Sequence, residues 1–364
     1  MLSIRAVTHA ATVQISDPGA NTQAPSDPFS RWATGLILDP RDVPFVALIT
    51  QASLIVLPFA IYLFLPGRFR WWLAAIYLAV VFAGFLDRYI LMLHNTSHRT
   101  LFRPRLRWMN HYIPWVLGPF FGESPETYYS HHIGMHHPEN NLEDDLSSTM
   151  AFQRDRIDHF LRYFFRFFFV GLAECSRYLH SKGRRTLMIR MVLGELTFLA
   201  SVALLLALNW RAALTVFVIP FVAVRFLMMA GNWGQHAFID AAKPDSAYGN
   251  SITCINSRYN RRAFNDGYHI GHHVRANRHW TEMPGDFLKN LPTYASQGAI
   301  VFEGIDFFMV WLFLMLRRYD WLAARYVNLD GRVRSREEIV ALLRVRTQPV
   351  LTPASDLSPL PSPL

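Results

Sequence analysis

Apolar residues gather in four long runs, and the runs come in two closely spaced pairs. The first pair covers residues 44–66 and 71–93, and the second covers residues 187–208 and 212–229. A run of about 20 apolar residues is long enough to cross a bilayer as a helix. Because short turns join the two runs of each pair, we expect two hairpins that cross a membrane and return. The pattern therefore predicts an all-α integral membrane protein with four transmembrane helices.

The segments outside these runs complete the predicted organisation. Residues 1–30 are rich in Ser, Thr, Asp, Ala and Pro, and residues 347–364 carry five prolines. Both compositions are typical of disordered tails, so the membrane domain is predicted to cover residues 31–346. Residues 299–316 are also apolar, but a fifth span there would place the basic stretch that follows on the opposite side. We expect a helix lying in the membrane interface, with a fifth span as the alternative.

Charge gives the orientation of this predicted bundle. The chain has 36 Lys and Arg residues against 27 Asp and Glu, and its formal net charge is +9. Twelve of the basic residues lie in the loop 94–186, which predicts that this loop, both termini and everything after about residue 232 are cytoplasmic. Nucleic-acid binding is disfavoured because the charge does not gather on a known motif. The two cysteines provide no Cys-based zinc or iron–sulfur signature.

Most of the 15 histidines fall into three clusters on the predicted cytoplasmic side. His94 and His98 are four residues apart, a spacing that aims both imidazoles at a common point from one helix face. In the second cluster, His132 and His136 are predicted to share a helical face, and His137 lies about 100° further round. An adjacent pair of this kind can serve two metal ions held side by side. The alternative interpretation of this cluster is a pH-sensing or nickel-binding tract.

The third cluster follows the second hairpin, which returns it to the same side of the membrane. It contains His269, His272 and His273, and a single His236 stands just after the fourth span. Asn232 lies four residues before His236, on the same helix face. The candidate ligands are thus His94, His98, His132, His136, His137, His236, His269, His272 and His273.

Nine imidazoles are too many for one metal. A tetrahedral zinc takes four ligands, and a mononuclear iron site with two histidines and a carboxylate takes three. Carboxylate di-iron bundles use Glu-x-x-His pairs, a pattern that the chain lacks. Of these kinds of metal site, the one that remains is a nitrogen-rich site with two iron ions, which activates O2.

These motifs resemble the membrane fatty acid desaturase and hydroxylase superfamily over roughly residues 44–290. The resemblance rests on H-x3-H, H-x3-HH and H-x2-HH, separated by transmembrane hairpins. It implies a mushroom-shaped protein with a cytosolic cap, in which the nine histidines bind two irons and Asn232 holds a metal-bound water. It also implies a fatty acyl lipid substrate. Because the chain has no His-Pro-Gly-Gly signature of cytochrome b5, electrons would come from a separate ferredoxin- or cytochrome b5-like donor.

Several residues depart from the family pattern or extend it. His131 could replace His132 as a ligand, and His279 could support a ligand from behind. The acidic loop 139–145 is predicted to be mainly solvated, with one or two side chains behind the histidines, and Asp266 is predicted to orient the third cluster.

Four charged residues lie inside the predicted spans and are therefore functional candidates: Asp87, Arg88, Glu195 and Arg225. A basic cap that would attract an acidic donor includes Arg154, Arg156, Arg258 and Arg261.

The first motif matches neither HExxH of alkane hydroxylases nor HDxxH of carotenoid ketolases, which favours fatty acyl desaturation. Hydroxylation or carotenoid oxidation at the same site is the first alternative. A non-enzymatic membrane receptor with a structural metal is the second.

Overall fold

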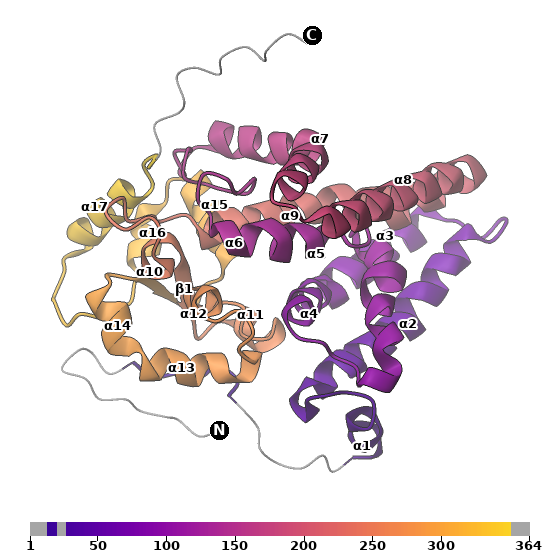
Figure 1. Ribbon diagram of the computed structural model, residues 1–364, viewed down its shortest axis with the longest axis horizontal. Coiled ribbons are helices and arrows are strands. Elements are labelled where there is room, and N and C mark those ends of the chain that lie inside the picture. Colours follow the sequence, from indigo (N-terminus) through magenta and orange to yellow (C-terminus); the bar gives the residue numbers. More distant parts are fainter. Residues whose placement is uncertain (1–12, 20–26, 351–364) are drawn as a thin grey trace, which may run out of the picture.

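The computed structural model describes residues 13–19 and 27–350 and is mostly helical. Its long helices lie together on one side, and short elements of the C-terminal third form a cap on the other (Figure 1). Three stretches in the described residues are long and apolar enough to cross a membrane: Pro40–Phe64, Trp71–His98 and Arg185–Gln235. The four predicted runs thus lie in three continuous stretches.

The first hairpin is formed by α2 and by a long helix that contains a wider, π-helical turn. Its elements, with the two short helices that precede it, are α1 (Pro28–Thr34), η1 (Pro40–Asp42), α2 (Val43–Phe64), α3 (Trp71–Ala79), η2 (Val80–Leu86) and α4 (Asp87–His98). The turn between α2 and α3 contains Gly67, whose φ of 70° is in the left-handed region.

The third apolar stretch contains a break at the position where the sequence predicts a turn. It comprises α8 (Arg185–Ala213), η7 (Leu214–Val218) and α9 (Ile219–Gln235). Asn209 has φ −153° and ψ 85°, which no helix can accommodate. Residues at similar distances before and after this break meet: Glu195 pairs with Arg225, and the ring of Phe198 stacks on Phe221. The chain therefore reverses near Asn209, and α8 and α9 run antiparallel.

The segment between the two hairpins packs tightly against the second one. It contains η3 (Pro104–His111), η4 (Ile113–Leu117), η5 (Gly118–Phe121), α5 (Thr127–His131), η6 (His132–His136), α6 (His137–Glu139) and α7 (Ile157–Ser181). A Cβ on Gly122 would lie 2.3 Å from the carbonyl oxygen of Pro220, and one on Gly194 would lie 1.9 Å from that of Pro125. Only glycine permits these backbone approaches. They fix the start of α5, and hence the second histidine cluster, against α8 and α9.

The cap contains two short strands, so the prediction of an all-α protein is wrong in this detail. Its elements are α10 (Ala247–Asn250), β1 (Ile252–Ile255), α11 (Arg258–Arg262), α12 (His269–Val274), η8 (Trp280–Glu282), α13 (Met283–Lys289), α14 (Leu291–Ser296), β2 (Ile300–Glu303), α15 (Phe307–Met315), α16 (Tyr319–Ala323) and α17 (Arg336–Arg346). The strands pair in parallel, with Ile252 opposite Ile300 and Ile255 opposite Glu303.

The same region corrects the prediction of one helix over residues 299–316. Gly304 has a φ of 73°, and Asp306 caps α15 by accepting a hydrogen bond from the backbone N–H of Met309. These two residues end the strand and start a separate nine-residue helix that packs against α9. In the described part of the chain, this segment is not among the candidate spans.

The predicted N-terminal tail is partly packed. Val13 and Ile15 are buried in the cap, and Oδ2 of Asp17 accepts hydrogen bonds from the Tyr268 hydroxyl at 2.7 Å and from Nδ2 of Asn260 at 2.9 Å. We call residues 13–19 the N-terminal strap. At the other end, Thr347 is fully buried. The rest of the two predicted tails, residues 1–12, 20–26 and 351–364, lies outside the described residues.

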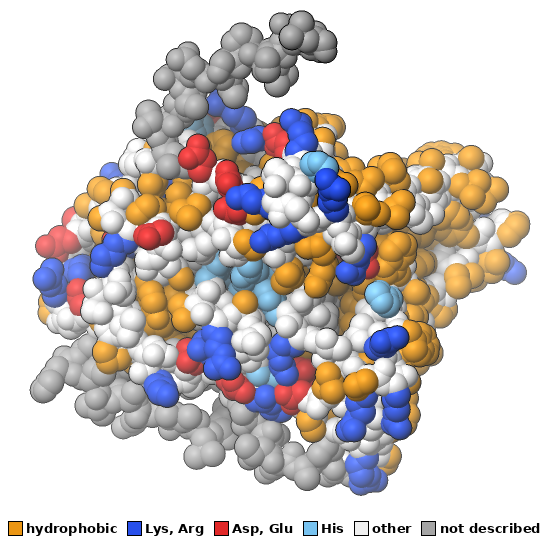
Figure 2. Space-filling model, in the orientation of Figure 1, with side chains coloured by type: hydrophobic (Ala, Val, Ile, Leu, Met, Phe, Trp, Pro, Cys, Tyr) orange, Lys and Arg blue, Asp and Glu red, His pale blue; other side chains and the backbone are white. Residues whose placement is uncertain are grey.

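The surface divides in the same way as the fold. Hydrophobic side chains cover the end of the molecule that holds α2, α3 and α8, whereas charged side chains lie over the cap, α7 and the region of α1 (Figure 2). Large side chains on these helices are strongly exposed, such as Leu54 at 70% and Leu208 at 72%. Exposed apolar surface of this extent is expected on helices that face lipid.

One basic residue does not belong to the charged surface of the cap. Arg154 is fully buried and donates hydrogen bonds to backbone carbonyls, including those of Ala237 and Arg346, both at 3.0 Å. The prediction that it attracts an electron donor is therefore wrong. Arg156, Arg258 and Arg261 are exposed.

Candidate metal centre

Nine histidine side chains converge between the long helices and the cap, and they divide into two groups. Within each group, one ring nitrogen from every histidine lies within 4.8 Å of the others. The five-histidine group contains His94, His98, His132, His137 and His272. The four-histidine group contains His136, His236, His269 and His273. These are the nine histidines that the sequence singles out.

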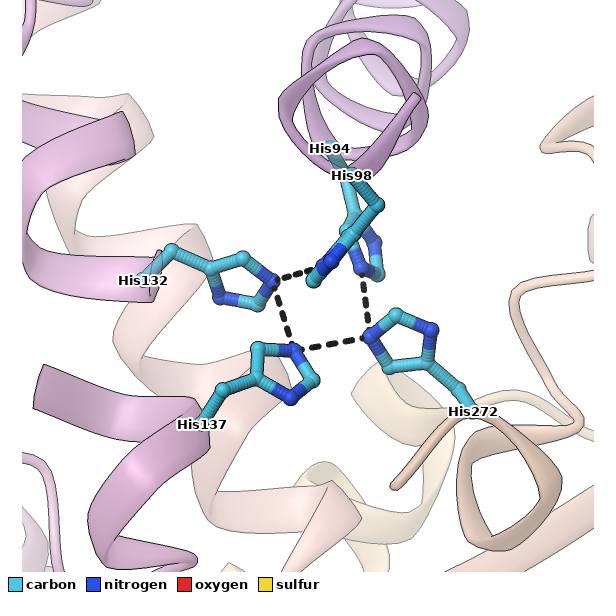
Figure 3. A group of neighbouring side chains, drawn as sticks. All are labelled: His94, His98, His132, His137 and His272. Atoms are coloured by element: carbon cyan, nitrogen blue, oxygen red, sulfur yellow. Dashed lines mark hydrogen bonds between the residues drawn. The ribbon is translucent and has the colours of Figure 1, made fainter. Parts of the chain in front are cut away.

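The rings of the five-histidine group face one another from three segments (Figure 3). The Nε2 atoms of His94 and His272 are 2.9 Å apart, as are those of His98 and His132. The Nε2 atom of His137 lies 3.1 Å from that of His132 and 3.0 Å from that of His272. Imidazole ligands lie about 2.0–2.1 Å from a transition metal, so two ligands at right angles have nitrogens about 2.9 Å apart. The observed spacing fits ligands around one ion.

The four-histidine group is centred on the end of α9 and on α12. The Nε2 atom of His269 lies 3.3 Å from that of His236 and 3.0 Å from that of His273. The ring of His136 completes the group, with its centroid 5.4 Å from that of His236 and 5.3 Å from that of His273. His236 is fully buried at the C-terminal end of its helix.

A π-helical turn assigns the histidines of the second cluster to the two groups. In η6 the backbone N–H of His137 bonds to the carbonyl of His132, five residues earlier. Residues five apart are aligned in such a turn, so His132 and His137 point to the same group. The structure therefore divides His132 and His136 between the two groups, although their rings stack with centroids 5.6 Å apart. The adjacent pair His136 and His137 does serve both groups, as the sequence predicts.

Polar side chains and carbonyls orient several of these rings from behind. Nδ1 of His136 lies 2.7 Å from Oδ2 of Asp145, and Nδ1 of His236 lies 2.9 Å from the carbonyl oxygen of Asn250. Nδ1 of His94 lies 3.3 Å from Oδ1 of Asp266. An acceptor at Nδ1 keeps the proton there and leaves the Nε2 lone pair free for a metal. Asp145 is thus a buried partner of a histidine. Asp266 contacts His94 of the first cluster, and not a histidine of the third cluster, for which the sequence predicts an orienting role. Asn250 has no sequence signal that identifies it.

Burial favours the neutral form of several of these imidazoles. Burial first, and then nearby His136, lowers the pKa of His236 to about 4. Burial, followed by neighbouring histidines, also lowers the pKa of four others well below the usual value: His132, His269, His272 and His273. Neutral imidazole is the form that binds metals. These five histidines are therefore in the form that coordinates a cation at neutral pH.

The model of the fatty acid desaturase family matches residues 69–305. The match covers more than half of the chain and includes all nine histidines. The chain belongs to the fatty acid desaturase family. It is accordingly an oxidoreductase. No curated protein matches the sequence.

Two histidines that the sequence left open lie outside both histidine groups. His131 packs against the ring of Phe167, and its Nε2 is buried without a hydrogen-bond partner among the described residues. The grouping favours His132 as the ligand. His279 bonds through Nε2 to Asp42 at 3.0 Å and through Nδ1 to Thr281 at 2.8 Å, so it supports no histidine of either group.

Asp39, Asp42 and His279 form a third group whose spacing would permit a metal ion. Arg41 lies 2.7 Å from Asp39, and Arg99 lies 2.9 Å from Asp39 and 3.7 Å from Asp42. These arginines already compensate the two carboxylates, which makes an additional cation unnecessary.

A cavity of about 540 Å³ reaches both histidine groups. His94 and His132 of the one group and His136 and His269 of the other line it, and so does Asn232. Nδ2 of Asn232 donates to the Tyr163 hydroxyl at 2.7 Å. Most of the remaining wall is apolar and comes from the two hairpins, α7 and α15, including Phe82, Leu86, Ile90, Leu227, Met228 and Phe308. The cavity has the size and lining of a lipid site.

Proposed function

We propose that the protein is an O2-dependent fatty acyl desaturase in which each histidine group holds one iron ion. The observation that carries the proposal is the position of two groups of imidazoles on a mainly apolar cavity, in a member of the fatty acid desaturase family. Five and four nitrogen donors suit two five- or six-coordinate ions, and they exceed what a single zinc takes. When bound, the iron pair supplies the activation of O2.

In the overall reaction, two C–H bonds on neighbouring carbons break and a C=C bond forms. One O2 takes up the two hydrogens together with two electrons and two protons, and leaves as two waters. The electrons come from a separate donor, either ferredoxin-like or cytochrome b5-like. Arg156, Arg258 and Arg261 give the cap an exposed positive charge that suits an acidic donor.

The chain's own residues position and protect the reacting lipid. Apolar side chains from both hairpins hold the acyl chain and exclude water from the histidines. Asp145, Asp266 and the Asn250 carbonyl keep the rings oriented. Asn232 lines the cavity beside His136, a position that suits its proposed role in holding a metal-bound water.

We also propose that the domain, residues 31–346, crosses the membrane four times, with the metal groups and both termini in the cytoplasm. The reversal near Asn209 supports two spans in the second hairpin. The basic residues of the loop 94–186 support the orientation.

Metal analysis and lipid profiling test the proposal together. The full chain and its His272→Ala variant are expressed in a heterologous host with a donor, and His180→Ala, which changes an exposed histidine, is the control. We expect about two irons per chain and lipids lighter by two hydrogens in the wild type and in the control. His272→Ala should lose the lipid change and bind less iron. A gain of one oxygen would instead indicate hydroxylation or carotenoid oxidation. A single zinc with unchanged lipids would indicate a non-enzymatic receptor.

A further inference from the structure

Three polar side chains from neighbouring elements line one part of the cavity, whose other polar lining residues include Asp87, Gln235 and Asp306. They are Glu123, which follows η5, Thr127 at the start of α5, and Arg225 of α9. Glu195 of α8 lies behind them and is 3% exposed. Charged groups at this depth in a bundle of apolar helices are costly, and they are functional candidates for that reason.

Arg225 and Glu195 balance one another. Nη2 of Arg225 lies 2.8 Å from both carboxylate oxygens of Glu195. Oγ1 of Thr127 donates to Glu195 at 2.9 Å, and the Ser124 hydroxyl donates to the same oxygen. The Glu195 carboxylate therefore has hydrogen-bond donors from the protein, and the pair of Glu195 and Arg225 carries no net charge.

The guanidinium of Arg225 still has donors to offer. All of its hydrogen bonds to the described residues run through Nη2, to Glu195 and to the Ser124 hydroxyl. Its face covers the ring of Phe221, with the guanidinium carbon 4.1 Å from the ring centroid. Nε and Nη1 therefore remain for a ligand in the cavity.

Glu123 is the second group with unused hydrogen-bonding capacity. It is 7% exposed, and its Oε1 has no partner within the described part of the chain. Burial raises the pKa of Glu123 to about 8, which Arg225 opposes and Glu195 reinforces. At neutral pH this side chain is mainly a neutral acid that can donate as well as accept a hydrogen bond.

A plain hydrocarbon would leave these groups without partners. A carboxylate or phosphate would add an uncompensated charge, because Glu195 already neutralises Arg225. A neutral oxygen, either a hydroxyl or a carbonyl, satisfies the free donors without adding charge.

We propose that Glu123 and Arg225 form a polar subsite that binds a neutral hydroxyl or carbonyl oxygen of the lipid substrate. The inference rests on the proposed function and narrows its substrate to a lipid that bears such an oxygen. Thr127 precedes His132 by five residues, which is about 7–8 Å along a helix. An oxygen held there would lie several carbons from the histidines and would determine which carbons reach them. It is either the carbonyl at the carrier end of the chain or an oxygen within the chain.

Binding of three eighteen-carbon probes to the purified full chain distinguishes these sources. Octadecane, methyl stearate and octadecan-9-ol compete with cis-parinaric acid, whose fluorescence reports occupancy. We expect methyl stearate or octadecan-9-ol to bind about tenfold more tightly than octadecane, as one buried hydrogen bond would give. Preference for methyl stearate alone indicates the carrier-end carbonyl, and preference for octadecan-9-ol alone indicates an oxygen within the chain.

Glu123→Leu should remove the preference, and Glu123→Gln should keep most of it. The double variant Arg225→Met with Glu195→Met removes the ion pair without leaving a buried charge. It should also remove the preference, and it tests the subsite if Glu123→Leu does not fold. Tyr77→Phe is the matched control, because the Tyr77 hydroxyl is buried without a described partner but lies off the cavity.

Equal binding of all three probes to the wild type, or an unchanged preference in the variants, would overturn the subsite. The assay needs neither iron nor an electron donor, so this outcome is separate from the fate of the desaturase proposal. If no probe displaces cis-parinaric acid, the cavity is not a lipid site, and both proposals fail.

Discussion

The two histidine groups differ in how many ligands they have and in how those ligands are supported. The five-histidine group takes His94 and His98 from the first hairpin, and the four-histidine group takes His236 from the second. In the smaller group, acceptors hold His136 and His236 from behind at 2.7 and 2.9 Å. In the larger group the corresponding contact, from His94 to Asp266, is 3.3 Å. The group with fewer ligands is thus the one with the closer supporting contacts.

The groups share the elements that lie between them. The second cluster gives His132 and His137 to one group and His136 to the other, and α12 gives His272 to one and His269 and His273 to the other. Each hairpin supplies one group only, so a pair of metals would join the two halves of the molecule. Changes in shared elements should affect both groups, and changes in a hairpin should affect one.

The largest effect is expected from deleting Ile133, which lies in the π-helical turn. The deletion would shorten the five-residue spacing of His132 and His137 to four and turn the following histidines by about 100°. Both groups should lose their metal, so iron measured on purified protein should fall from about two per chain to almost none. Gly134→Ala is the control, since the added carbon would meet only the flexible ends of Leu179 and Leu187. A deletion protein that retains two irons would show that the turn does not assign the ligands.

A smaller effect, limited to one group, is expected from His236→Ala. It leaves three histidines in a group of four, whereas His98→Ala leaves four in a group of five. His236→Ala should abolish turnover and retain one iron per chain. His98→Ala should retain more iron than His236→Ala, because its group keeps four histidines. The protein should still insert, because lipid and helix packing hold the spans. His159→Ala and His180→Ala, outside both groups, should behave like the wild type. If His236→Ala did so too, His236 would be an ordinary helix end.

The set of nine histidines was predictable because their local spacing and the hydropathy of the chain both point to it. The four-residue spacing of His94 and His98 aims two rings at one point, and the hairpins return the distant clusters to one side. The distribution between the groups was not predictable, because His132 and His136 have the same spacing as His94 and His98. The wider turn at His132–His136 sets this distribution, and the close glycine contacts hold the segment before it against α8 and α9.

The supporting residues were harder to predict for a related reason. Asn250 reaches His236 through a backbone carbonyl, which leaves no trace in the sequence. Asp17 lies in a segment of low hydrophobicity and meets Tyr268 across 251 positions of the chain. Composition indicates only whether a segment can fold by itself. The N-terminal strap packs because the cap supplies buried partners for it, and composition does not show these partners.

The supporting carboxylates give a third test of the comparison. Asp145→Ala removes the close contact to His136 in the four-histidine group, and Asp266→Ala removes the longer contact to His94 in the other. Outer partners of this kind typically change metal affinity by about 10–100-fold. We expect the larger loss for Asp145→Ala, measured as the rate at which a chelator removes iron. Equal rates in both variants would show that contact length does not determine support.

The smallest effect is expected from Asp17→Ala in the N-terminal strap. The change leaves the Tyr268 hydroxyl and the Asn260 amide without this buried acceptor, which costs about 1–3 kcal/mol and should lower the melting temperature. Tyr268 directly precedes α12, which contributes to both groups. The chelator should therefore remove both irons a few-fold faster, in contrast to the one-sided effect of Asp145→Ala. Ser16→Ala, one residue away at the surface, is the control. Faster release of only one iron would mean that α12 does not act on the two groups as a single rigid unit.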